Sequence, residues 1–461
     1  MARLWQEGLW RPARDIPFVV LSAAVVLSLI RSVEQPSVDI AIGGTSVSLV
    51  PADVAFAALA AVAALKLLGS GSLPRPARTV AYSAAAFSAW LLISSAASGF
   101  DAFVGAAKLL EHGLLGLGAV LIVRRRPQLW LLVALLVALT AAAAVHGILQ
   151  FLGVPGVGGH PGRRNPAWLG EHDFAALATL SLTFAIASLY ARGHRLGRLP
   201  LVAGVAGAIG VTLGAAVAGL VGLWLAVAAI VGLALVRRAV TRRALVVTAL
   251  VTALVTGGVL GLRAGDIGSV LRWLGIQKHE EAPGVYAASF SQRVIYVYIG
   301  GRMFLDSPVT GVGWYGLIPG EKYARYLPDA RERFPGQPAS YFPSSTGTFI
   351  PQQTYDQVLY ELGAVGVVLF LLLGGLTVRT AVGVAQRWPR GDPDELAAYL
   401  PVAWVTALAG GLAGAALFGG IPFAAVFWLT LGVAALGPSL VPVRGLAPER
   451  IAAGELTVAA R

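Results

Sequence analysis

Long apolar segments separated by short polar connections run through most of the chain. Twelve of them can be distinguished, and most approach the roughly 20 residues with which a helix crosses a bilayer. They lie at about 17–31, 51–68, 79–98, 102–123, 128–152, 173–191, 200–216, 218–236, 244–262, 363–386, 396–417 and 420–441. The pattern predicts an all-α, polytopic integral membrane protein with about 12 transmembrane helices.

Composition strengthens this prediction and narrows the possible chemistry. Of the 461 residues, 57% are hydrophobic and 13% are charged, whereas a soluble protein has about 25% charged residues. A soluble enzyme, a coiled coil and a disordered chain are therefore excluded. The chain has no cysteine, which excludes disulfides, thiolate metal sites and cysteine nucleophiles. The basic start and the first apolar segment lack a convincing cleavage site and are interpreted as a retained signal anchor.

The net charge of +12 follows the predicted topology. If the N-terminus is cytoplasmic, every inner connection carries arginine or lysine, as the positive-inside rule requires. Both termini are then cytoplasmic, and the arginine-, alanine- and glycine-rich usage is typical of a high-GC bacterium, so a bacterial cytoplasmic (inner) membrane is expected. We attribute the charge to topology and to contact with anionic membrane lipids, and expect no nucleic-acid partner.

The connections differ greatly in length. The predicted organisation is transmembrane helices 1–9 (residues 1–262), an extracytoplasmic loop domain with short interfacial helices (263–357), transmembrane helices 10–12 (358–441) and a cytoplasmic tail (442–461). A loop as long as the one between helices 9 and 10 is commonly functional. Within it we expect an interfacial helix at 289–306 and an amphipathic stretch at 321–334; residues 32–50 are expected to form a small hairpin.

Arginines in the predicted outer loops are candidate anion ligands. Arg163 and Arg164 lie in a G-R-R-N motif, and Arg293 closes an S-Q-R motif nine residues before Arg302. The planar guanidinium stays charged and binds phosphate oxygens bidentately. Taken singly, such arginines can equally pair with lipid headgroups. Occurring in two separate loops beside short polar motifs, they favour a shared anion site, whereas Arg263 is interpreted as an ordinary solvated charge.

Other ionisable residues have two interpretations each. Lys108, Glu111 and His112 share one face of the fourth helix. They form either an internal pair that fixes helix packing, or the floor of a lipid-phosphate cavity or a proton path. His172 opens the sixth helix and suits proton transfer near neutral pH. The histidine spacing fits no metal-site pattern, so no metal is expected.

Three motifs together carry a family resemblance. They are the helix that bears Arg293, the P-x-x-G-x-G turn at 308–313 and the E-x-G-x-x-G helix start at 361–366. With the twelve-helix layout and the long loop between helices 9 and 10, they resemble the O-antigen ligase and O-antigen polymerase superfamily. The resemblance implies a membrane glycosyltransferase that moves a glycan from undecaprenyl pyrophosphate to an acceptor, without nucleotide, metal or other cofactor.

The chain departs from that pattern where the resemblance places the catalytic histidine and its asparagine. Gln352 and Gln353 stand there, and glutamine is not a general base. Likewise, residues 216–219 carry no arginine at the start of the eighth helix, where the family often has a Ser-Arg pair. Either Asp356, Glu361 or His172 supplies the base, or Gln352 only orients the acceptor, or the protein binds a lipid-linked glycan without catalysis.

These observations favour an inverting glycosyltransferase of cell-surface polysaccharide assembly, acting on the outer face. Arg293 would stabilise the departing pyrophosphate, and Asp356 or Glu361 would deprotonate the acceptor hydroxyl. The residues expected to bind the lipid-linked glycan, the glycan or lipid acceptor, or both are Lys108, Arg163, Arg164, His172, Arg302, Gln353 and Tyr355. The alternatives are a non-catalytic glycan-binding protein and a transporter of a polyprenyl-linked glycan.

Overall fold

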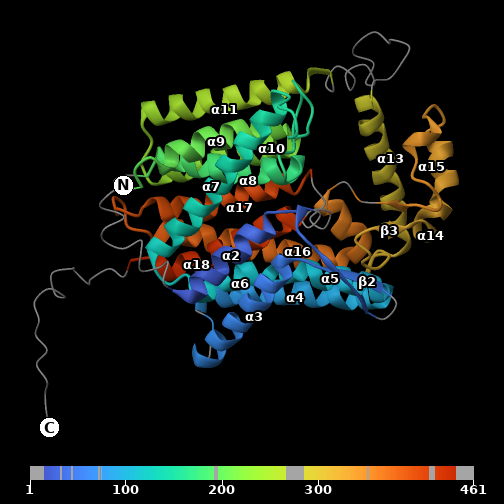
Figure 1. The fold of residues 1–461 in the computed structure, drawn as a ribbon, viewed down its shortest axis with the longest axis horizontal. Helices are drawn as coiled ribbons and strands as arrows, with labels where there is room; N and C mark the ends of the chain where they lie inside the picture. The colour runs from blue at the N-terminus through green and yellow to red at the C-terminus, as the bar shows by residue number, and fades with distance from the viewer. Residues whose placement is uncertain are drawn as a thin grey trace, which may run out of the picture.

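The computed structural model describes residues 15–31, 34–42, 45–70, 73, 75–191, 196–265, 285–349, 351, 353–414 and 421–442. This part of the chain is a bundle of long helices with two short antiparallel strand pairs (Figure 1). The helices of the first half are α2 (Ile16–Ser28), α3 (Pro51–Ser70), α4 (Arg75–Ser98), α5 (Phe100–Glu111), α6 (Gly113–Ile122), α7 (Arg126–Phe151), α8 (Glu171–Ser188) and α9 (Leu199–Gly214). Those of the second half are α10 (Val217–Val236), α11 (Arg242–Leu262), α13 (Val285–Asp306), α14 (Gly320–Tyr323), α15 (Leu327–Arg333), α16 (Thr354–Arg387), α17 (Leu396–Gly411) and α18 (Ile421–Leu440).

Each predicted apolar segment contains helix, and the all-α membrane class is confirmed. Within the described residues, eight helices are long and apolar enough to cross a membrane: α3, α4, α5 with α6, α7, α10, α11, α16 and α18. Helices α2, α9 and α17 are apolar but shorter, so twelve crossings remain a prediction. Two boundaries differ from expectation, because the fourth segment breaks at His112 and α16 begins nine residues early, at Thr354.

Small residues bring the central helices into backbone contact. A Cβ on Gly222 of α10 would lie 2.4 Å from the carbonyl oxygen of Ala407 on α17, and one on Gly410 would lie 2.3 Å from the Gly222 nitrogen. Close approach of this kind stabilises helix pairs where no water is available to drive association. The indole of Trp404 on α17, which is fully buried, donates to the carbonyl of Leu180 on α8 at 3.1 Å. Helix α17 is thus fixed between α8 and α10.

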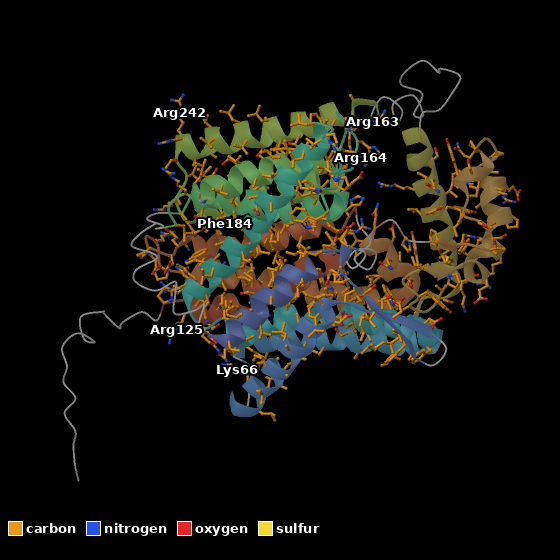
Figure 2. All side chains as sticks on the ribbon, viewed as in Figure 1. Lys66, Arg125, Arg163, Arg164, Phe184 and Arg242 are labelled. Carbon is orange, nitrogen blue, oxygen red and sulfur yellow. The ribbon has the colours of Figure 1, made fainter. Side chains whose placement is uncertain are left out.

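The two ends of the bundle carry different features (Figure 2). Lys66, Arg125 and Arg242 lie toward one end, on the left of the view, and Arg163 and Arg164 lie at the other, near α13. We call the second end the loop end, because α13, α14 and α15 lie beside it (Figure 1). This separation agrees with the charge pattern of the connections. Which end faces the cytoplasm remains a prediction.

The segment beside the loop end has a hydrophobic cluster of its own. Ile295, Ile299 and Met303 of α13 pack with Tyr323 and Phe349. The short strands β3 (Ile318–Pro319) and β4 (Thr348–Phe349) pair antiparallel beneath it. The expected helix at 289–306 lies within α13, and the stretch at 321–334 forms α14, the 3₁₀ turn Ala324–Tyr326 and α15. The expected hairpin at 32–50 is β1 (Val38–Ile42) paired with β2 (Thr45–Leu49).

Candidate functional site

His172, at the loop end, lies within the electrostatic influence of three arginines. The side chain of His172 is largely buried, and this burial, followed by the charges of Arg293, Arg263 and Arg164, lowers the pKa of His172 to about 4. Burial and then the charge of Arg164 also lower the pKa of Arg293. These residues come from four separate parts of the chain: the α7–α8 loop, the first turn of α8, the end of α11, and α13. We call Arg164, His172, Arg263 and Arg293 the basic cluster.

The buried amide of Asn165 shapes the loop that carries Arg164. Its Oδ1 accepts the backbone N–H of His160 at 2.8 Å, and its Nδ2 donates to the carbonyls of Arg163 at 2.8 Å and His160 at 3.1 Å. Asn165 is 0% exposed, so the loop folds around it. Arg164 then pairs with Glu171 at the start of α8 at 2.6 Å, whereas Arg163 is exposed. The sequence predicts a function for the two arginines of the G-R-R-N motif, and it gives no indication of the structural role of Asn165.

Arg263 lies against the turn between α9 and α10, which its sequence context did not indicate. Its Nε donates to the carbonyl of Ala215, in the turn between α9 and α10, and Ala215 has a φ of 44°. The side chain is folded back against the bundle and half-buried, so its interpretation as an ordinary solvated charge was wrong. Residues 216–219, which lack an arginine of their own, begin directly after the carbonyl that Arg263 contacts.

The two arginines of α13 have different surroundings. The Nε of Arg293 is buried and has no hydrogen-bond partner, and no ion pair joins Arg293 to any residue in the described part of the chain. Arg302 is nine residues further along, which places it on the opposite face of the helix at about 100° per residue. Its Nε pairs with Asp329 of α15 at 3.1 Å, and both side chains are about half exposed. Arg302 therefore holds α15 against α13, and Arg293 remains available for a ligand.

Helix α16 is interrupted at Gly363, whose φ is 64° and ψ is −163°. The turn at 308–313 inserts there and satisfies backbone groups on both sides of the break. The N–H groups of Val312 and Gly313 donate to the carbonyls of Tyr360 and Glu361 at 3.0 and 3.1 Å. Beyond the break, Ala364 donates to Pro308 at 2.9 Å. A Cβ on Gly311 would lie 2.4 Å from the Glu361 carbonyl, so the two glycine motifs found in the sequence are one packing unit.

Glu361 ties this unit together. It is fully buried, and one carboxylate oxygen accepts the N–H groups of Tyr315 at 2.6 Å and Gly316 at 2.8 Å. The other oxygen accepts from Gln357 at 3.0 Å. A carboxylate with both oxygens occupied is an acceptor that orders the turn. These contacts make Glu361 a positioning residue for the loop, and leave Asp356 as the carboxylate without an internal partner.

The beginning of α16 carries the remaining candidates from the sequence. Gln352 lies outside the described residues, and Gln353 precedes the helix without a side-chain cap. The Tyr355 hydroxyl donates to the Ala409 carbonyl at 2.8 Å, which joins α16 to α17. Asp356 is partly buried and makes no hydrogen bond or ion pair within the described chain.

Helices α13 and α16 contact each other close in sequence to Arg293 and Asp356. The Tyr360 hydroxyl donates to the Val297 carbonyl at 3.3 Å. Residues four apart share one face of a helix. Asp356 therefore lies one turn from the α16 side of this contact, and Arg293 lies one turn from its α13 side.

Lys108 belongs to a different region. Its ammonium pairs with Asp53 at 3.4 Å and donates to the Ser48 carbonyl, which fixes the hairpin β1–β2 to α3 and α5. The partner is thus Asp53 in place of the Glu111 that the helical spacing favoured. No contact in the described residues joins Lys108 to the basic cluster.

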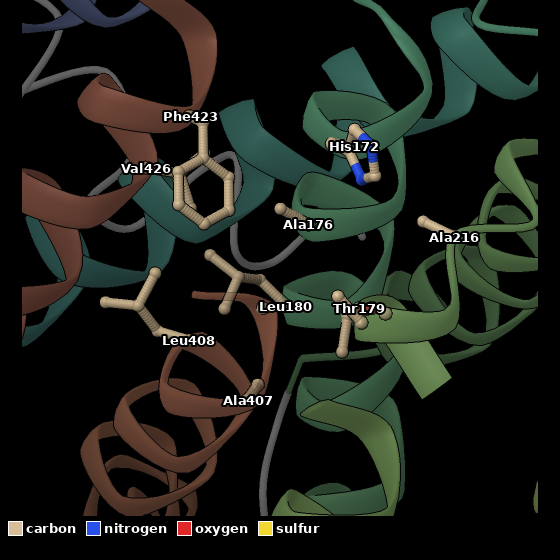
Figure 3. A pocket seen from close by; sticks show the side chains of 12 residues that line it. His172, Ala176, Thr179, Leu180, Ala216, Ala407, Leu408, Phe423 and Val426 are labelled. Carbon is tan, nitrogen blue, oxygen red and sulfur yellow. The ribbon is translucent and has the colours of Figure 1, made fainter. Parts of the chain in front are cut away.

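A small cavity opens beneath His172 (Figure 3). It measures about 10 Å³ and lies between α8, α10, α17 and α18, with Phe423 and Leu408 across from His172. That volume is at the lower limit for one ordered water. Most of its lining is apolar, and the Nδ1 of His172 is buried without a partner.

The cluster is therefore suited to bind an anion. Within the described chain, no group of three or more histidine, aspartate or glutamate side chains is arranged to hold a metal ion. No protein-family model matches this chain, and a search of the curated proteins finds no match.

Proposed function

We propose that this membrane protein transfers a glycan from undecaprenyl pyrophosphate to an acceptor hydroxyl, at the outer face of a bacterial cytoplasmic membrane. The observation that carries the proposal is the basic cluster, and above all the partly buried Arg293, whose Nε is buried and has no partner within the described chain. A buried unpaired cation is unfavourable, and an anion bound beside it removes that penalty. A diphosphate offers several oxygens to Arg293, Arg263 and Arg164 at once.

The reaction needs one bond made and one broken. The acceptor oxygen attacks the anomeric carbon, and its proton passes to the carboxylate of Asp356. On the opposite face the bond between the anomeric carbon and the phosphate oxygen breaks, and the electron pair leaves with the lipid diphosphate. The positive charges of the cluster stabilise the charge that develops on that oxygen. The configuration at the anomeric carbon inverts.

The two candidate groups lie on two helices, α13 and α16, that contact each other. Arg293 and Asp356 each lie one helical turn from the Tyr360–Val297 contact between α13 and α16. Glu361 orders the turn that follows α13, and so holds the helix bearing Arg293 against α16.

The decisive test compares the two arginines of α13. Purified protein in lipid nanodiscs would receive an undecaprenyl-pyrophosphate glycan and cell-envelope acceptors, and release of the lipid diphosphate would be measured. We expect Arg293→Ala to lower release by at least about 100-fold. Arg302→Ala, on the opposite face of the same helix, is the matched control and should retain activity. Full activity of Arg293→Ala would sink the assignment.

A further inference from the structure

His172 has surroundings that keep its ring neutral while the cluster is empty. It lies in the first turn of α8, where the helix dipole is positive, and Arg164, Arg263 and Arg293 add three cationic charges. Its Nδ1 is buried and unpartnered, and the ring faces the small apolar cavity. Each of these features opposes a proton on the imidazole. Burial is the largest cause of the low pKa of His172, and a bound anion would oppose the contribution that the arginine charges add.

The other charges near His172 do not supply that anion. Glu171, its neighbour on α8, is paired with Arg164 at 2.6 Å. The carboxylate of Asp173 accepts the backbone N–H of Phe423 and interacts with the charge of Arg31. The residues of α10, α17 and α18 that line the cavity carry no charge. The charges that lower the pKa of the imidazole are those of Arg293, Arg263 and Arg164, and Arg164 is the one of them that Glu171 pairs.

We propose that His172 is a proton-coupled contact of the diphosphate site: its imidazole takes up a proton when a diphosphate binds to the basic cluster, and then donates a hydrogen bond to that diphosphate. This inference rests on the proposed function, since it assumes that the cluster binds the donor's diphosphate. Binding of the anion neutralises the arginine charges, which removes the repulsion that the imidazolium would otherwise meet.

The proton has a use in the transfer step. When the bond between the anomeric carbon and the phosphate oxygen breaks, that oxygen gains an electron pair and one negative charge. The imidazolium of His172 gives its proton to the departing diphosphate and returns to the neutral form, while Asp356 holds the proton from the acceptor. One proton passes from the acceptor hydroxyl to Asp356, and one passes from His172 to the diphosphate, so protons and charge balance. Loss of its proton to solvent restores Asp356.

Calorimetry of inorganic pyrophosphate binding to the whole protein in nanodiscs tests the coupling. Titration at pH 6.5 in two buffers with different ionisation enthalpies gives the number of protons taken up per pyrophosphate. We expect the wild type to take up more than His172→Gln, with a difference approaching one proton per site. Protons taken up by pyrophosphate itself are counted in both proteins. The difference in proton uptake between wild type and His172→Gln therefore measures the uptake by the imidazole. His160→Gln is the matched control, because His160 is exposed in the adjoining loop, and it should match the wild type.

The outcomes separate the two proposals. Pyrophosphate binding with equal proton uptake in wild type and His172→Gln would overturn the role of His172 and leave the anion site standing. Absence of binding to the wild type would overturn both. If His172→Gln does not fold, His172→Asn replaces it. The pH dependence of wild-type affinity gives a second measure: affinity should rise about tenfold for each unit of acidification beyond the change due to pyrophosphate alone.

Discussion

Two arginines, the buried Arg237 and the partly buried Arg293, differ in how their charges are compensated. Arg237, beside the α16–α17 connection, is 6% exposed, and its Nη2 and Nε donate to Glu395 at 2.6 and 3.1 Å. Its Nη1 donates to the carbonyls of Ala385 and Trp388. Arg293 has a buried Nε with no partner within the described chain, and the charge of another cation, Arg164, acts on it.

The difference distinguishes an arginine that stabilises the fold, Arg237, from one that we propose binds a ligand, Arg293. A buried cation with all its donors matched is held in one position, and its carboxylate partner cancels its charge. A buried cation among other cations lowers stability until an anion arrives. Perturbed groups of this second kind cluster at functional sites, and this is why we assign function to the basic cluster.

The largest change in the free energy of unfolding is expected when Arg237, whose donors are paired, is replaced. Arg237→Met leaves Glu395 buried without its cation, so the free energy of unfolding should fall by about 3–5 kcal/mol. Thermal unfolding in detergent would measure the change. Arg242→Met, at an exposed position on α11, is the control and should stay within about 0.5 kcal/mol of the wild type. An equally stable Arg237→Met protein would contradict the comparison.

Glu361→Gln sharpens the distinction between a positioning residue and a base. The amide nitrogen of the new side chain would face a hydrogen-bond donor, so stability should fall by about 2 kcal/mol. Transfer should decline because the turn at 308–316 loosens, with stability and activity lost together. A variant with wild-type unfolding temperature and no transfer would instead identify Glu361 as the base.

Arg293→Gln should change the free energy of unfolding in the opposite direction to Arg237→Met and Glu361→Gln. Removal of an unpaired cation from a cationic cluster should raise the free energy of unfolding by about 1 kcal/mol, while pyrophosphate binding is lost. The unfolding temperature with and without pyrophosphate checks both halves of this expectation: the wild type should gain stability from the anion, and the variant should not. Equal stabilisation of both proteins would remove Arg293 from the site.

The smallest effect is expected at Lys108. Lys108→Met breaks a partly exposed pair with Asp53, and such pairs contribute about 1 kcal/mol or less. Stability should therefore change little, and pyrophosphate affinity should stay the same. A clear loss of affinity would restore the sequence-based hypothesis that Lys108 contacts the diphosphate.

Much of the architecture followed from local patterns. Apolar length predicted the helices of the bundle, and the arginines of the connections separated its two ends, as Figure 2 shows for Arg125 and Arg164. The helix that carries Arg293 was also predicted. The helical turns at 354–362 and the break at Gly363 were not predicted, because the apolar segment begins only at about 363 and the local sequence gives no sign of a second segment inserting its backbone there.

Residue chemistry and spacing by themselves determined that the chain is a helical membrane protein, and they selected Arg163, Arg164, Arg293 and Arg302 as candidate anion ligands. Only the tertiary structure decided which charges meet. It placed Arg263 beside His172 and paired Lys108 with Asp53. Within the described chain it also left the Nε of Arg293 without a partner, while pairing both carboxylate oxygens of Glu361. The physical reason is that helix formation depends on neighbours within a turn or two, whereas burial and charge pairing depend on residues that only packing brings together.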